Sequence, residues 1–122
     1  MSKKYGGKDG FIVNLSSGAA KYGSPGEYVD YAASKAAIDT LTIGLAREVA
    51  EEGIRVNALR PVFIETEIHQ SGVESDRMER VRPLVPMKRV GQAEEVADAI
   101  MWLLSDKASY TTGTILDVSG GR

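Results

Sequence analysis

Residues 11–17 read FIVNLSS, an apolar run that ends in two serines. Gly10 precedes the run and Gly18 follows it. A short apolar run between such residues is typical of a buried β-strand. Functional side chains in open α/β sheets usually lie just beyond the carboxyl ends of the strands. We therefore expect a strand here, with Ser16 and Ser17 at its functional end.

A long amphipathic helix is expected next, from about residue 28 to residue 52. This stretch lacks proline and contains a single glycine. Its apolar side chains recur at steps of three and four residues, which predicts one apolar face. They are Ile38, Leu41, Leu45 and Val49. Gly53 follows as a suitable left-handed cap.

Two more strands and one more clear helix are predicted downstream. The strands are expected at residues 54–59 and 114–118, two short segments rich in apolar residues. The helix is expected at residues 93–105, where Glu94 and Glu95 occupy the first turn. Carboxylates in that position are stabilised by the helix dipole.

The order of these elements predicts an α/β fold in one domain. Strands that alternate with helices form parallel sheets joined by right-handed crossovers. Residues 63–90 have a weaker pattern, with a helical segment at about residues 74–81, and we interpret them as a substrate lid or loop region. Residues 1–10 are expected to form a flexible lead-in. Because parallel sheets usually contain further strands, the first strand is expected to pair with another strand that these residues do not supply.

The composition restricts the possible functions. The chain has 122 residues, of which 43% are hydrophobic and 26% charged, as in an ordinary soluble domain. The net charge is −2 and the basic residues are scattered, which argues against nucleic-acid binding. No apolar run approaches the roughly 20 residues that span a membrane. The absence of cysteine is compatible with a reducing cytoplasmic location.

Metal chemistry is also disfavoured by the sequence. Thiolate sites are excluded because there is no cysteine, and His69 is the only histidine. A His-centred triad or a multi-histidine metal site therefore has little support, and we predict no metal. His69 is expected to be a solvated residue of the lid.

Tyr31 and Lys35 form a candidate proton-transfer pair on the long helix. Their spacing of four residues places both side chains on one helix face, one turn apart. A neighbouring ammonium favours the charged phenolate form of a tyrosine and makes proton exchange feasible. Taken alone, the pair is equally described as a surface tyrosine near a solvated lysine, because the chain has five tyrosines and such matches arise by chance.

Five segments of the chain, in one consistent order, resemble the short-chain dehydrogenase/reductase family. They are IVNLSS at 12–17, YAASKAA at 31–37, GIRVNALRP at 53–61, PMKRVG with EEVA at 86–97, and the turns and strand of 105–121. Together they cover almost the whole chain beyond Gly10. The resemblance implies a partial Rossmann-like fold, the C-terminal half of a doubly wound parallel sheet with three parallel strands and flanking helices. It also implies an NAD(P)-dependent oxidoreductase that interconverts a carbonyl and an alcohol.

The resemblance implies catalytic roles for three residues. Tyr31 would be the general acid/base, Lys35 would hydrogen-bond the nicotinamide ribose and favour the phenolate, and Ser17 would orient the substrate oxygen. Ser17 lies fourteen residues before Tyr31, one more than is usual in the family, which an extra loop residue near residues 26–30 explains. Tyr28 is a poorer candidate because position 32 is Ala rather than Lys.

Three further positions match the family's contacts with the nicotinamide end of the cofactor, namely Pro61, Ile64 and Thr66. Tyr31 and Lys35 would contribute to the same binding site. One departure is Val62, which stands where the family usually has Gly, so the turn is expected to differ. An alternative role for Thr66 is to cap a helix that begins at the next residue.

Several features of a whole family member are not found in these residues. The Gly-rich turn that cradles the pyrophosphate, the Asn-Asn-Ala-Gly segment and the residue that selects NAD or NADP are missing. The cofactor is therefore expected to be NAD or NADP by resemblance alone. The 122-residue chain by itself is expected to bind nicotinamide cofactors weakly and to be inactive.

The expected partners are a small-molecule carbonyl or alcohol substrate and further copies of the chain, as a dimer or tetramer. The family associates through the long helix and through the last helix and strand, and Trp102 is expected in the core or in such an interface. An alternative is a truncated, non-catalytic module that retains only these association surfaces. A third possibility is an unrelated small α/β binding domain, which would require the five matches to be coincidental.

Overall fold

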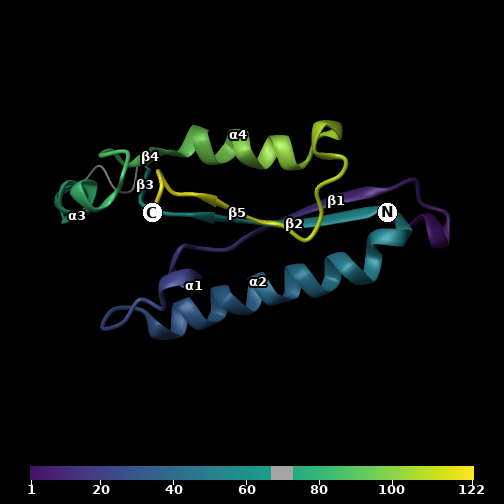
Figure 1. Cartoon of the computed structure of the whole chain (residues 1–122), viewed down its shortest axis with the longest axis horizontal. Coiled ribbons are helices and arrows are strands. Elements are labelled where there is room, and N and C mark those ends of the chain that lie inside the picture. The colour runs from purple at the N-terminus through teal and green to yellow at the C-terminus, as the bar shows by residue number, and fades with distance from the viewer. Residues whose placement is uncertain (67–72) are drawn as a thin grey trace.

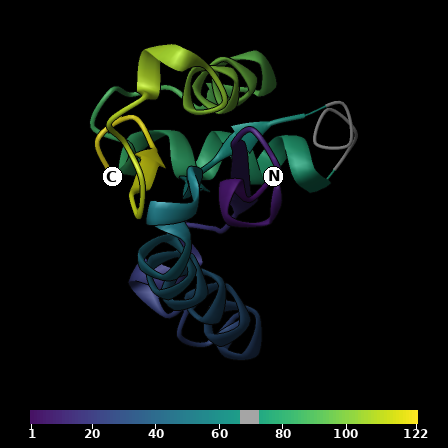
Figure 2. The same ribbon diagram turned by 90° about the vertical axis from the view of Figure 1, so that its right-hand side faces the viewer.

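The computed structural model describes residues 1–66 and 73–122, which form a parallel β-sheet between two helices. The sheet contains the strands β1 (Gly10–Leu15), β2 (Ile54–Pro61) and β5 (Ile115–Val118), in the order β1-β2-β5. The helix α2 (Val29–Val49) covers one face, and α4 (Ala93–Leu103) covers the other (Figures 1 and 2). The predicted α/β arrangement of three parallel strands with flanking helices is confirmed.

Shorter elements connect this framework, and the sequence predicted only one of them. The helical segment expected near residues 74–81 is α3 (Val73–Val81). The others are η1 (Lys3–Tyr5), α1 (Ala19–Tyr22), η2 (Ala50–Glu52), β3 (Ile64–Glu65), η4 (Arg82–Leu84), β4 (Gly91–Gln92) and η5 (Asp106–Ala108). β3 and β4 pair in parallel, Ile64 with Gly91 and Glu65 with Gln92. Two-residue strands carry no periodic signal, so the pair could not be predicted from the sequence.

The register of the main sheet brings the carboxyl ends of its strands to one edge. Leu15, the last residue of β1, pairs with Leu59, and Leu59 in turn pairs with Leu116. Beyond β1, the backbone N–H of Ser16 donates to the carbonyl of Leu59 at 2.8 Å. At this edge lie α1, α3 and the C-terminus, on the left of Figure 1.

The core is built around β2, the central strand. Val56, Ala58 and Leu59 are fully buried, and Val56 packs in one cluster with Ala46 of α2. Leu103 of α4 is also fully buried. Helices cover both faces of β2, so even its polar Asn57 is buried.

The apolar face predicted for α2 is partly wrong. Leu45 and Val49 pack against the core as expected, but Leu41 is 56% exposed. The buried face instead carries the small side chain of Ala46 and the hydroxyl of Thr42. Thr42 Oγ1 donates to the Ile38 carbonyl at 2.8 Å and accepts from Asn14 Nδ2 at 3.0 Å. Because these bonds satisfy the hydroxyl, a polar residue occupies a core position that an apolar pattern cannot reveal.

Residues 1–10 make specific contacts with the body of the protein. Ser2 caps η1 by accepting from the backbone N–H of Lys4, and its Oγ donates to Glu52 Oε1 at 2.5 Å. The flexibility expected for this lead-in stays a prediction. None of the helices in the described parts of the chain has the length and apolar character that a membrane crossing requires.

The beginning of α4 is stabilised by an ionised carboxylate. Glu95 accepts hydrogen bonds from Arg89 Nη1 at 2.7 Å and from the backbone N–H of Gln92 at 3.1 Å. The bond from Arg89 first, and the bond from Gln92 second, lower the pKa of Glu95 from 4.5 to about 2. Because this pKa lies below the ordinary value, the contribution to stability is complete above about pH 4.5 and is lost as the pH falls toward 2.

We expect Glu95→Gln to lower the melting temperature near neutral pH and to have a much smaller effect at about pH 2.5, where the native carboxylate is itself becoming protonated. Thermal unfolding followed by circular dichroism from about pH 2.5 to about pH 7 measures this difference. Glu94→Gln is the matched control, since it removes a neighbouring exposed carboxylate from the same helix turn. A melting-temperature difference that stays constant with pH would contradict the assignment.

Candidate active site

A cavity of about 560 Å³ lies at the carboxyl edge of the sheet. Its walls come from the turn after β1, the loop before α2, the end of β2, α3 and the C-terminus. Lining residues that bear on the chemistry are Ser17, Tyr28, Tyr31, Pro61, Arg77 and Arg122. This volume is in the usual range for a small-molecule site, and the position is where open α/β sheets bind ligands.

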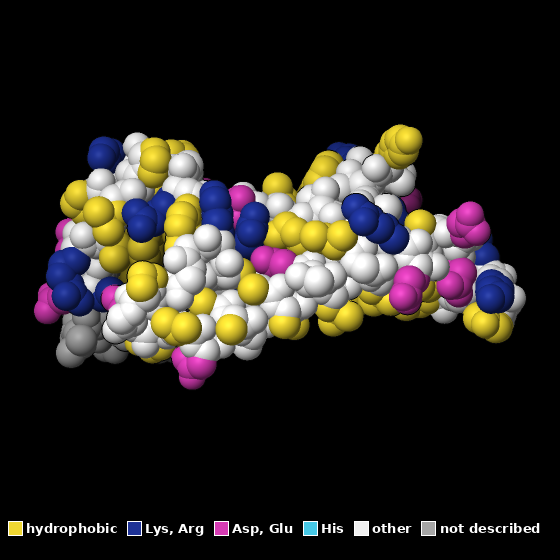
Figure 3. Space-filling model, turned by 60° about the horizontal axis from the view of Figure 1, so that its bottom comes forward, with side chains coloured by type: hydrophobic (Ala, Val, Ile, Leu, Met, Phe, Trp, Pro, Cys, Tyr) yellow, Lys and Arg dark blue, Asp and Glu magenta, His cyan; other side chains and the backbone are white. Residues whose placement is uncertain are grey.

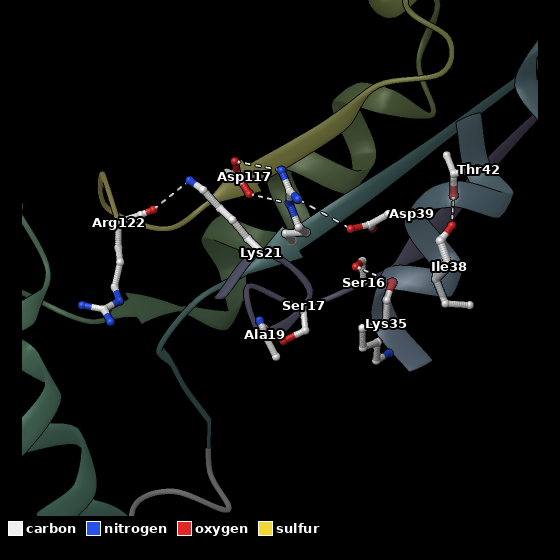
Figure 4. A network of polar contacts seen from close by, with 11 residues as sticks. Ser16, Ser17, Ala19, Lys21, Lys35, Ile38, Asp39, Thr42, Asp117 and Arg122 are labelled. Atoms are coloured by element: carbon white, nitrogen blue, oxygen red, sulfur yellow. Dashed lines mark hydrogen bonds and ion pairs between the residues drawn. The ribbon is translucent and has the colours of Figure 1, made fainter. Parts of the chain in front are cut away.

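The two serines that follow β1 have different surroundings. Ser16 is buried, and its Oγ donates to the backbone carbonyl of Lys35 at 3.3 Å. Ser17 lines the cavity, and its Oγ accepts from the backbone N–H of Ala19 at 3.1 Å (Figure 4). Since that bond uses the oxygen as an acceptor, the Ser17 hydroxyl proton remains able to donate to a ligand. Of the two hydroxyls, Ser17 is the one on the cavity wall.

Tyr31 and Lys35 lie one turn apart at the beginning of α2. Tyr31 lines the cavity and is 45% exposed. Lys35 Nζ lies 5.7 Å from the centre of the Tyr31 ring and donates to the backbone carbonyl of Leu15 at 3.0 Å. Lys35 does not line the cavity, and its ammonium is bonded to the last residue of β1. The spacing of four residues thus brings amine and phenol together as predicted.

The turn after β2 contains Val62, at the position where the family usually has Gly. The backbone N–H of Val62 donates to Val118 at 3.0 Å, which prolongs the pairing of β2 with β5. The left-handed backbone conformation falls one residue later, on Phe63, with φ of 51°. A bulky residue in this region costs about 1–3 kcal/mol. The Val62 side chain packs against Gly18 on the cavity wall.

The three cofactor-contact positions are not all in the large cavity. Pro61 lines it, whereas Ile64 lines a neighbouring cavity of about 200 Å³. Thr66 follows β3, is half-buried and lines neither cavity. The helix that Thr66 was expected to cap, and His69, lie outside the described residues. The cofactor roles of these three residues stay predictions.

The structure adds aromatic and basic residues that sequence reasoning missed. Tyr28, set aside because no lysine follows it at the right spacing, lines the same cavity as Tyr31. The guanidinium of Arg122 lies 5.2 Å from the centre of the Tyr22 ring and 5.5 Å from that of Phe63. No local pattern could have revealed these contacts, because Arg122 lies 100 positions from Tyr22 and 59 positions from Phe63.

An ionic network holds α2 to the carboxyl edge of the sheet. Arg60 donates to both carboxylate oxygens of Asp117, from Nε at 2.8 Å and from Nη2 at 3.3 Å. Its Nη1 lies 3.5 Å from Asp39 Oδ2. Asp39 and Asp117 therefore approach one guanidinium from α2 and from β5 (Figure 4). Since Asp39 lies one turn beyond Lys35, the network fixes the part of α2 that carries the candidate pair.

In the described ranges 1–66 and 73–122, no group of His, Cys, Asp and Glu side chains is arranged to hold a metal ion. Trp102 is 43% exposed, so the expectation of a core position for it is wrong and only the interface expectation remains.

Comparison with known proteins identifies the family. The family model described as enoyl-(acyl carrier protein) reductase matches residues 1–122. The chain belongs to the short-chain dehydrogenase/reductase family. Within the family it is 65% identical over its full length to the uncharacterized oxidoreductase YgfF of Escherichia coli K12, of which it spans 49%.

Solved structures in the family share this fold. The 3-oxoacyl-[acyl-carrier protein] reductase of Brucella melitensis superposes with a TM-score of 0.83 at 44% identity, over 91% of this chain and 41% of that one. A structure of such a reductase from the same organism with bound NAD gives 0.79 at 43% identity, over 91% of this chain and 40% of that one. The chain thus spans less than half the length of these family members.

The contact between Gly18 and Val62 leads to a prediction about packing. A methyl group added at Gly18 would lie 2.3 Å from Val62 Cγ2, whereas the backbone of Gly18, at φ −55° and ψ −24°, accepts any residue. We expect Gly18→Ala to destabilise the protein by about 1–3 kcal/mol through overpacking. Val62→Ala in the same chain should remove most of this cost.

Urea denaturation of the four members of this double-mutant cycle measures the coupling. Additive effects of the two substitutions would show that Gly18 and Val62 do not touch.

Proposed function

We propose that this chain supplies the proton-transfer half of an NAD(P)-dependent oxidoreductase that interconverts a small-molecule carbonyl and an alcohol. One observation carries the proposal. The Ser17 hydroxyl and the Tyr31 phenol line one cavity. The Lys35 ammonium lies 5.7 Å from the centre of the Tyr31 ring and donates a hydrogen bond to the Leu15 carbonyl. A phenol, a cation and a hydroxyl at one site are the groups needed to move a proton onto or off a substrate oxygen.

In the proposed mechanism each residue has one task. Tyr31 donates a proton to the carbonyl oxygen during reduction and takes one from the alcohol during oxidation. Lys35 stabilises the phenolate through its positive charge, and Ser17 donates a hydrogen bond to the same substrate oxygen. When bound, the nicotinamide cofactor supplies or accepts the hydride.

The residues present fit the nicotinamide end of such a cofactor. Lys35 Nζ lies at the carboxyl end of β1, the edge at which open parallel sheets bind dinucleotides, and Pro61 forms part of the same cavity wall as Tyr31. Lys35 and Tyr31 would hold the ribose, and Pro61, Ile64 and Thr66 the nicotinamide. The bound NAD in the Brucella structure supports a nicotinamide cofactor. Either NAD or NADP is compatible with the residues of this half.

We also propose that residues 1–122 form the C-terminal portion of a single family domain, with residues 63–90 as its substrate lid. The chain spans 49% of YgfF and 41% of the Brucella reductase, which supports this division. A cytoplasmic location suits a chain without cysteine.

A chimera tests the proposed catalytic role. The amino-terminal half of the Brucella reductase would be joined to this chain, and cofactor-dependent carbonyl reduction would be followed by absorbance. We expect the chimera to be active and Tyr31→Phe to lower kcat by roughly 100-fold to 10,000-fold, because general acid/base catalysis is lost. Lys35→Met should cause a similar loss.

Tyr28→Phe is the matched control, since Tyr28 is an exposed tyrosine on the same cavity wall with no lysine one turn further on. It should retain most of the activity. Equal losses for the two tyrosines, or an active Tyr31→Phe chimera, would refute the assignment.

A second candidate function is association without catalysis, which exposed apolar side chains favour. Leu41 of α2 and Met101 of α4 are 56% and 65% exposed, and Trp102 lies beside Met101. Figure 3, which brings the α2 side forward, shows apolar side chains along that face. Exposed apolar side chains on two helices are typical of surfaces that bury a partner, and we propose a further copy of the chain.

Light scattering during size-exclusion chromatography tests this association. We expect Leu41→Glu and Met101→Glu each to lower the oligomeric state, because a charge would be buried in the interface. Tyr110→Glu is the control, since Tyr110 is a highly exposed aromatic residue outside both helices. A wild-type chain that elutes as a monomer would refute the proposal that it associates with further copies through α2 and α4.

A further inference from the structure

We propose that the ligand of the large cavity carries an anionic group, a carboxylate or a phosphate, which Arg122 binds with help from Arg77. The inference deepens the proposed function, on which it rests for the claim that this ligand is the substrate. It assigns the basic residues of the cavity, which the proton-transfer chemistry does not use, to substrate recognition.

The guanidinium of Arg122 contacts aromatic rings but has few hydrogen-bond partners. It lies near the rings of Tyr22 and Phe63, at 5.2 and 5.5 Å from their centres. Its Nε is shut off from solvent and has no hydrogen-bond partner, and its Nη1 makes only a long bond of 3.4 Å to the Leu84 carbonyl. In the parts of the chain that the structure describes, no carboxylate pairs with this cation. A partly desolvated charge in this state is stabilised by an anion.

The backbone at Arg122 is anchored separately from its side chain. The Tyr22 hydroxyl donates to the backbone carbonyl of Arg122, and Lys21 Nζ lies 3.5 Å from the same oxygen. Figure 4 shows the Arg122 side chain directed away from Lys21. The anchors therefore hold the main chain of a residue that lines the cavity.

The charges on the cavity wall favour an anion. Arg77 of α3 is the second cation on the wall and is half-buried, and among the described side chains, those of 1–66 and 76–122, it forms no ion pair. The acidic residue on the wall is Glu27, which is exposed and therefore better screened by water. Figure 3 shows Lys and Arg side chains over its left part, the end of the molecule that carries α1, α3 and the C-terminus, with Asp and Glu side chains among them.

The shape of the guanidinium indicates the class of group that it binds. Two parallel N–H donors match the two oxygens of a carboxylate or phosphate, and aromatic rings are groups against which a guanidinium packs well. The same cavity presents Ser17 and Tyr31 to a carbonyl oxygen. A substrate that fits both ends is a small oxo compound with an anionic group at a fixed distance from its carbonyl.

Ligand titrations of the isotope-labelled 122-residue chain, followed by NMR without cofactor, test the proposal. The probes are acetoacetate, its uncharged methyl ester and inorganic phosphate, all at constant ionic strength. We expect acetoacetate or phosphate to bind at the cavity roughly tenfold or more tightly than the ester, since a charge-assisted bidentate contact is lost in the ester. Tighter binding of acetoacetate identifies a carboxylate substrate, and tighter binding of phosphate a phosphorylated one.

Variants locate the binding group. Arg122→Gln should weaken anion binding by roughly tenfold and leave ester binding unchanged, and Arg77→Gln should weaken it less. Arg47→Gln is the matched control, because it removes the same charge from an exposed position of α2 outside the cavity. If Arg122→Gln unfolds the chain, the anion affinity of Arg77→Gln tests whether the cavity binds the anion.

The proposal is overturned if neither anion shifts the resonances of cavity residues, if the ester binds as tightly as acetoacetate, or if Arg47→Gln weakens binding as much as the cavity variants. These titrations involve no turnover. An inactive chimera would therefore refute the proposed reaction and leave the proposed anion binding intact. An active chimera whose activity is unchanged by Arg122→Gln would refute only the proposal that the substrate carries an anionic group bound by Arg122.

Discussion

The pairing of β2 with strands on both its sides is the constraint on which the remaining structure depends. It places the ends of β1 and β5 at one edge, and therefore fixes where Ser17, Pro61 and the C-terminal Gly-Gly turn meet. Buried Asn57 shows how closely this pairing is specified. Its amide donates to the Thr111 carbonyl at 3.0 Å and accepts from the backbone N–H of Thr114 at 3.0 Å. These bonds fix the loop that leads into β5, since a buried amide without partners is costly.

The same edge shows how the protein orients its candidate catalytic groups with backbone atoms. The Leu15 carbonyl holds the Lys35 ammonium, and the Lys35 carbonyl accepts from buried Ser16. The end of β1 and the first turns of α2 are thus bonded to each other in both directions. A helix fixed this way loses little freedom when a ligand binds, which is what preorganised catalysis requires.

Local sequence signals predicted much of this arrangement, and the limits follow from physics. Periodicity revealed α2, α4 and the three strands because each buries a face against a neighbour. The spacing of Tyr31 and Lys35 revealed their shared helix face. Leu41 was misplaced because Thr42, with its hydroxyl satisfied by Ile38 and Asn14, takes the core position instead. Tertiary hydrogen bonds of this kind leave no trace in an apolar pattern.

The basic residues of the cavity wall could not be predicted from the sequence for another reason. Arg122 comes near Tyr22 and Phe63 only in the folded chain, where segments far apart in the sequence meet at one edge of the open sheet. The proposed chemistry and the proposed recognition thus have different origins in this chain. The candidate proton-transfer groups come from one strand end and one helix turn. The proposed recognition groups come from α1, α3 and the C-terminus, so they can vary without disturbing the pair formed by Tyr31 and Lys35.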